Sequence, residues 1–121
     1  MSLMEFLKFG VSGWTWLGLL AFVLFVTHVT IVCVTVFLHR CQSHKALTLN
    51  PFVAHFFRFW LWLTTGMVTK EWVAIHRKHH AKCETDNDPH SPKIKGVNEV
   101  LWRGTELYRS SSKNSELIKK Y

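Results

Sequence analysis

Two apolar stretches dominate the first half of the chain, and basic and histidine-rich sequence follows each of them. The first, Trp14 to Leu38, holds 25 residues and no charged side chain. A helix of that length extends roughly 37 Å, enough to cross a hydrocarbon core of about 30 Å. We predict a transmembrane helix over 14–38 that continues past the membrane surface to His44. A secretory signal peptide has a shorter apolar region and a small-residue cleavage site, and this run has neither feature.

The second apolar stretch, 51–69, has 19 residues but includes His55 and Arg58. A charged side chain near the centre of a bilayer is costly, which argues against a full crossing. Histidine clusters flank the stretch on both sides, and a single crossing would separate them if they share one metal site. Its many aromatic residues suit the membrane interface. We predict an interfacial or re-entrant helix over 51–69, opened by Pro51.

The remainder, 70–121, is polar and is predicted to be a cytosolic segment. Residues 70–82 favour helix, 84–92 form a polar turn, 98–109 suit an amphipathic helix, and the serine-rich 110–115 predicts a loop. The fold class is therefore all-α, an integral membrane helical protein. We treat 1–121 as the N-terminal part of a single membrane domain.

The net charge of +7 lies entirely outside the first apolar run. By the positive-inside rule, the basic residues after each apolar stretch face the cytoplasm. Such a surface contacts anionic lipid headgroups, and it can also attract an acidic partner such as a small redox protein. No nucleic-acid-binding motif is present. Three cysteines without CxxC spacing argue against a disulfide framework.

The histidines are the most informative feature, with eight in 121 residues. Five form two clusters: the first cluster is His39-x-x-x-x-His44, and the second cluster is His76-x-x-His79-His80. On an α-helix the second cluster projects from one face, because its members are three and four residues apart. The first pair is separated by about 140° on an ideal helix. It converges only if the helix ends or distorts between the two residues.

Imidazole-rich sites suit Zn, Cu, Fe and Ni, whereas Mg, Ca and Mn prefer carboxylates. Five clustered histidines exceed what one four-coordinate zinc needs, so two metal ions fit the count better. Two irons bound in this way can activate dioxygen at the membrane surface, which points to a substrate with a long apolar tail. The competing interpretation is that the histidines simply contact lipid headgroups.

Other candidate residues have simpler interpretations when taken alone. His28 and His55 are interpreted as structural residues, with His55 beside Arg58 at a cavity. His90 follows Asp88-Pro89 and suits an exposed loop, and Trp72 suits an interfacial anchor.

The motifs taken together resemble the first two histidine boxes of the acyl-CoA Δ9 desaturase family, and bacterial acyl-CoA desaturases most closely. The resemblance covers roughly 28–92 and lies in four features. These are the residues 39–44, the residues 71–80 with a tryptophan four before the box, Glu84-Thr85, and Asp88-Pro-His-Ser91.

This resemblance implies a four-transmembrane-helix fold with a cytosolic diiron centre in a bacterial inner membrane, the histidine boxes facing the cytoplasm. The enzyme would place a cis double bond in a fatty acyl-CoA. Electrons would come from a ferredoxin-, rubredoxin- or cytochrome b5-like donor. The implied iron ligands are His39, His44, His76, His79 and His80. Trp72 would lie near the substrate, and Asp88 and His90 would form a turn that supports the box.

The family also carries a third histidine box and further helices, which do not occur before Tyr121. We therefore expect a fragment that is inactive in isolation. Two alternatives remain at this point: a membrane diiron hydroxylase of alkanes or sterols, and a non-catalytic haem- or metal-binding membrane protein.

Overall fold

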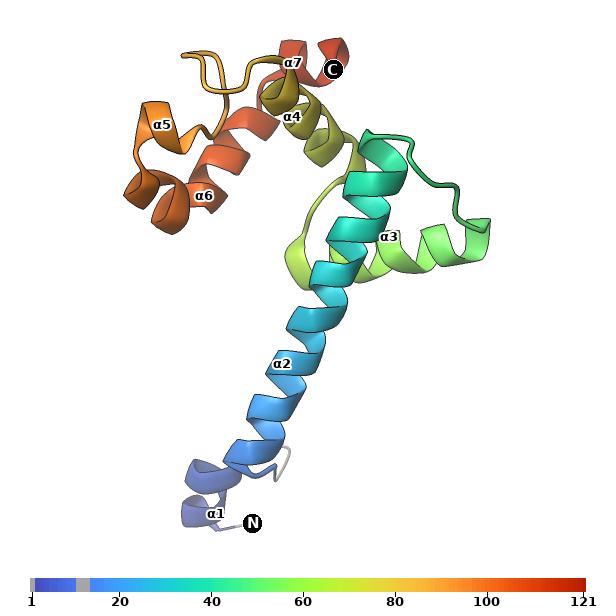
Figure 1. Ribbon diagram of the computed structural model, residues 1–121. Coiled ribbons are helices and arrows are strands. Elements are labelled where there is room, and N and C mark those ends of the chain that lie inside the picture. The colour runs from blue at the N-terminus through green and yellow to red at the C-terminus, as the bar shows by residue number, and fades with distance from the viewer. Residues whose placement is uncertain (1, 11–13) are drawn as a thin grey trace. The chain divides into compact units, whose positions relative to one another are not determined.

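The computed structural model describes residues 2–10 and 14–121, and these residues form helices and no strands. The all-α fold class predicted from the sequence is therefore correct. In chain order the elements are α1 (Leu3–Phe9), α2 (Trp16–Cys33), the π-helix η1 (Val34–Ser43), α3 (Pro51–Thr65), α4 (Thr69–Ala81), α5 (Pro92–Lys95), α6 (Val97–Ser112) and α7 (Ser115–Lys120), as drawn in Figure 1.

The chain divides into two compact units, Met1–Val32 and Cys33–Tyr121. In the first unit, Ser2 and Glu5 form a capping box that starts α1. The rings of Trp14 and Phe22 meet edge to face with centroids 5.3 Å apart. Trp14 and Trp16, at the start of the first apolar run, are both exposed.

Within the described residues, one helix is long and apolar enough to cross a membrane, Trp16–Ser43. Only 6% of its most apolar window is buried by other protein atoms, so its apolar side chains mostly face outward. Length and composition match the membrane helix predicted over 14–38, with the expected continuation to the first histidine cluster.

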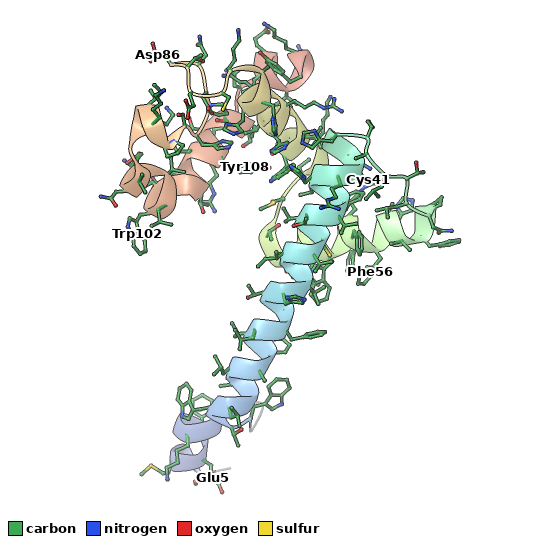
Figure 2. All side chains as sticks on the ribbon, viewed as in Figure 1. Glu5, Cys41, Phe56, Asp86, Trp102 and Tyr108 are labelled. Carbon is green, nitrogen blue, oxygen red and sulfur yellow. The ribbon has the colours of Figure 1, made fainter. Side chains whose placement is uncertain are left out.

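In the second unit, α3 begins at Asn50, whose side chain accepts a hydrogen bond from the Phe52 amide. It ends at Thr65 rather than at residue 69, since Gly66 adopts a left-handed conformation with φ 68°. The inner side of α3 carries the buried Leu61. Its aromatic side chains, including the Phe56 labelled in Figure 2, are largely exposed. Exposed aromatics suit the predicted interfacial position, which stays a prediction.

The helix α4 packs against the C-terminal segment. Ala74 and Ile75 of α4 are buried against Leu117 of α7, with Tyr108 and Ile118 packed around them. Figure 1 shows α4, α6 and α7 gathered in this part of the unit. This packing supports the element that carries the second histidine cluster.

Two details of the C-terminal prediction were wrong. The predicted loop over 110–115 is reduced to Lys113 and Asn114, because α6 continues to Ser112 and the side chain of Asn114 caps α7. The short α5 was not predicted either. It starts at Ser91, whose hydroxyl accepts from the Ile94 amide, with Pro92 in the first turn.

Candidate metal centre

The first histidine cluster lies at the end of the π-helical segment η1, with His39 inside it and His44 as its C-cap. In a π-helix each amide bonds the carbonyl five residues earlier, so residues five apart stack on one face. The His44 amide donates in this way to the His39 carbonyl at 3.1 Å. Ser43 adds a second five-residue link, from its hydroxyl to the Leu38 carbonyl at 2.8 Å. The His39 and His44 rings consequently meet, with centroids 4.5 Å apart.

The second cluster extends the same group from α4. His76 Nε2 lies 3.3 Å from His44 Nε2 and 3.0 Å from His80 Nε2. The His39 and His76 ring centroids are 4.8 Å apart. The ligand atoms of these four residues all lie within 4.8 Å of one another. We call His39, His44, His76 and His80 the four-histidine group.

His76 occupies the most protected position in this group. Burial, together with the nearby His80, His39, His44 and His79, lowers its pKa to about 4. Trp72 stacks on its ring at 4.7 Å between centroids and an interplanar angle of 14°. His76 is therefore neutral at pH 7, which is the form that binds metals.

His79, the remaining member of the second cluster, belongs to a neighbouring arrangement. Its Nδ1 lies 2.8 Å from Oδ1 of Asp88, whose side chain is 0% exposed. Because an ionised carboxylate can only accept, Nδ1 carries the proton and Nε2 stays free. His79, Cys83 and Asp88 have ligand atoms within 4.8 Å of one another.

Asp88 organises the turn that follows α4. It accepts hydrogen bonds from the backbone amides of Glu84 and His90 as well as from His79. Burial on its own would raise the pKa of Asp88, but these hydrogen bonds outweigh burial and lower it. The carboxylate is thus ionised and held by three donors.

His90 is not the exposed loop residue that its surroundings in the sequence indicated. It is half-buried, and its ring stacks on His79 with centroids 4.4 Å apart. Burial lowers its pKa, the neighbouring His79 lowers it further, and Asp88 opposes both. His90 therefore packs against a candidate ligand.

The four-histidine group fits a transition-metal ion by its donors. Two nitrogens bound to one ion at about 2.1 Å lie roughly 3.0–3.4 Å apart, and the separations of 3.3 and 3.0 Å around His76 match that range. All four donors are imidazoles, the type that suits iron or zinc. For a second ion, the described residues nearby offer His79, Cys83 and Asp88, a set that is smaller and partly engaged in the turn.

A cavity of about 690 Å³ opens beside this group. Trp72, His76 and His90 line it together with Tyr108 and Arg109. Tyr108, labelled in Figure 2, lies on α6. Its hydroxyl is buried and lacks a hydrogen-bond partner among the described residues. Trp72 therefore stacks on the candidate ligand His76 and also lines this cavity.

The isolated histidines lie elsewhere. His28 is exposed on α2, and His55 lines a separate cavity of about 560 Å³ with Arg58, as predicted. Sequence reasoning did not single out Ser43 or Cys83. The five-residue spacing of the first cluster was a signal for the π-winding that Ser43 supports.

Comparison with known proteins decides the family. The family model described as fatty acid desaturase matches residues 14–115. The chain belongs to the fatty acid desaturase family. This agrees with the resemblance carried by the two histidine clusters.

Several plant relatives of this desaturase-family chain have been identified. A probable chloroplastic lipid desaturase of Arabidopsis thaliana is 39% identical over 61 residues, covering 50% of this chain and 17% of the relative. The delta-9 acyl-lipid desaturase 1 of the same plant is 33% identical over 69 residues, 57% of this chain and 21% of that protein. The icosanoyl-CoA 5-desaturase of Limnanthes douglasii is 37% identical over 59 residues, 49% of this chain and 17% of the enzyme.

The matched region thus spans about a fifth of the length of these relatives. No solved structure matches the chain. The family is membrane-associated, in keeping with the apolar helix Trp16–Ser43.

Proposed function

We propose that this protein acts in the oxygen-dependent desaturation of a fatty acyl chain at a histidine-ligated iron site. The observation that carries the proposal is the convergence of His39 and His44 from η1 with His76 and His80 from α4. Residues far apart in the sequence supply imidazole donors at ligand spacing, in a chain of the fatty acid desaturase family.

In this proposal the four-histidine group holds one iron ion. His79 would offer its Nε2 to a second ion, because its Nδ1 is bound to Asp88. A pair of irons held by these residues would supply the dioxygen chemistry needed to remove hydrogen from an unactivated methylene. The chain's own residues orient the imidazoles, keep His76 neutral and shield it beneath Trp72.

The proposed substrate is a fatty acyl-CoA, with a cis double bond formed at the Δ9 position. Support comes from the resemblance of the two clusters to acyl-CoA Δ9 desaturases. The named relatives include one acyl-lipid and one acyl-CoA desaturase, so the family accommodates both ester types. The cavity of about 690 Å³ beside His76 is the proposed approach of the substrate, and Trp72 is its proposed contact.

We also propose two partners. One is membrane lipid, and the other is a small acidic electron donor that is ferredoxin-, rubredoxin- or cytochrome b5-like. Exposed cations such as Lys70 and Lys82 lie at the two ends of α4 and offer a basic surface close to the metal ligands. The proposed location is a bacterial inner membrane with both clusters on the cytoplasmic side. The basis is the positive-inside rule and the resemblance to bacterial enzymes.

The test is expression of the natural gene in cells that lack their own desaturase, followed by mass spectrometry of the fatty acids. We expect a new cis-unsaturated acid that disappears with His44→Ala and persists with His55→Ala, a histidine outside the four-histidine group. Hydroxylated products would instead support a hydroxylase. Equal products from the parent and from His44→Ala would overturn the proposal.

A further inference from the structure

The side chain of Arg77, next to His76 in the second cluster, binds main-chain carbonyls next to His44 in the first cluster. Its Nε donates to the Ser43 carbonyl at 3.3 Å, and its Nη2 donates to the carbonyls of Gln42 and Ser43 at 3.1 and 3.3 Å. Its Nη1 donates to the main-chain oxygen of Tyr121 at 3.2 Å. One guanidinium thus joins α4, the end of η1 and the C-terminal segment.

We propose that Arg77 is a positioning residue that sets the spacing between the two histidine clusters. Arg77 follows His76 directly in the chain, and the carbonyls that it binds directly precede His44. Fixing these neighbours fixes His44 against His76, whose Nε2 atoms lie 3.3 Å apart. The metal-related part of this inference rests on the proposed function, whereas the contact itself does not.

The chemistry of the guanidinium suits this role. The last carbonyls of a helix have no partner within the helix and carry partial negative charge. A planar guanidinium has five donors in a rigid fork and reaches two adjacent carbonyls at once, which an ammonium group cannot do in the same geometry. The segment η1 ends at Ser43, so Arg77 caps it from a different element.

Burial and pairing separate Arg77 from the surrounding cations. In the sequence, Arg77 falls among the basic residues after the second apolar stretch, which we expected to contact lipid headgroups. In the structure it is half-buried. None of the ion pairs found among residues 2–10 and 14–121 involves Arg77. Its charge is directed to carbonyl oxygens inside the protein. Lys70, in the first turn of the same helix, is exposed and provides a matched control.

The contact between Arg77 and the end of η1 can be tested without metal. The measurement is the distance between two spin labels on the protein in detergent. The native Cys41 of η1 and Cys83 after α4 carry the labels, and the buried Cys33 is replaced by Ala. We expect Arg77→Gln to lengthen and broaden the distance distribution, and Lys70→Gln to leave it unchanged. An unchanged distribution in Arg77→Gln would overturn the inference.

A conservative variant guards against simple unfolding. Arg77→Lys keeps the charge and one or two donors, so we expect a folded protein with a distribution between those of the parent and Arg77→Gln. Circular dichroism checks that the helix content is retained. A folded Arg77→Lys with the parental distribution would also count against the proposal.

A titration with Co²⁺ alone then measures the functional consequence. In the parent, His44→Ala should lower Co²⁺ affinity by about tenfold or more, on the scale of losses at perturbed metal sites. In Arg77→Gln the same substitution should change affinity by less than about twofold, because His44 is already displaced. Full dependence on His44 in Arg77→Gln would contradict the positioning role. A parent that binds no Co²⁺ would refute the proposed metal site, while the label distances still decide the contact.

Discussion

The two histidine clusters reach the same point by different helix geometries. On α4, His76 and His80 are four residues apart, and ordinary α-helical winding brings their rings together. On η1, His39 and His44 are five apart, and only π-winding aligns them. The comparison teaches that ligand spacing and helix type are matched, so an unusual spacing requires an unusual helix.

The clusters also differ in how their helices are held. The helix α4 rests on a small apolar core formed with Leu117. The segment η1 has Phe37 and Leu38 buried, with Phe37 meeting Phe57 of α3 at 6.3 Å between centroids. Polar links from Ser43 and Arg77 then secure its end. The first cluster therefore depends more on individual hydrogen bonds than the second.

The largest effect should come from removing the histidine that lies against members of both clusters. His76 lies within 3.3 Å of His44 and within 3.0 Å of His80. We expect His76→Ala to lower Co²⁺ affinity by about 100-fold or more, beyond the range seen when only supporting residues are lost. His55→Ala, on the exposed side of α3, should have no effect. Isothermal titration calorimetry compares the two, and equal affinities would contradict the shared site.

An insertion tests the match between spacing and winding. One Ala inserted between Arg40 and Cys41 changes the spacing of the first cluster from five to six and rotates His39 away from His44. We expect a loss in Co²⁺ affinity of roughly 10- to 100-fold. The same Ala inserted between Thr48 and Leu49, outside any helix, is the control. Similar affinities for both insertions would show that π-winding does not matter.

On the side of α4, Asp88 supports His79 and the following turn. Asp88→Asn removes a buried charge that accepts three hydrogen bonds, so we expect unfolding to become easier by about 2 kcal/mol. Asp86→Asn, which is exposed in the same turn segment, should change the free energy of unfolding by less than about 0.5 kcal/mol. Chemical denaturation in detergent measures both variants. An unchanged free energy of unfolding in Asp88→Asn would mean that the turn is stable without the carboxylate.

The smallest effect should come from the side-chain link in η1. Ser43→Ala removes the hydroxyl bond to the Leu38 carbonyl, a buried bond contributing about 1 kcal/mol. Hydrogen exchange at the end of η1 should accelerate by roughly fivefold, the rate equivalent of that loss. Ser110→Ala, on an exposed position of α6, is the reference. An unchanged exchange rate in Ser43→Ala would mean that packing alone stabilises the π-helical winding.

Much of this chain could be predicted from local patterns. The apolar run from Trp14 predicted a helix long enough to cross a membrane, because hydrophobicity and length are properties of the sequence itself. The spacing of His76, His79 and His80 predicted one helical face for the same reason. The errors fell on boundaries, such as the end of α3 at Gly66 and the helix through Ser110, where capping competes with composition.

The roles within the second cluster could not be predicted in this way. His79 shares the face of His76 and His80, yet its Nδ1 bonds Asp88 and its ring stacks on His90. Those partners come from a turn whose path depends on three hydrogen bonds to one buried carboxylate. A spacing rule describes directions along one helix and contains no information on what another segment brings to that face.

The sequence by itself determined the all-helical class, the apolar helix, the family and the two histidine clusters, because each depends on composition and short-range spacing. Only the tertiary structure decided which imidazoles converge, how Arg77 is used and where His90 lies. These depend on contacts between η1, α4 and the C-terminal segment. Such contacts form when carbonyls and a guanidinium far apart in the chain satisfy one another away from water.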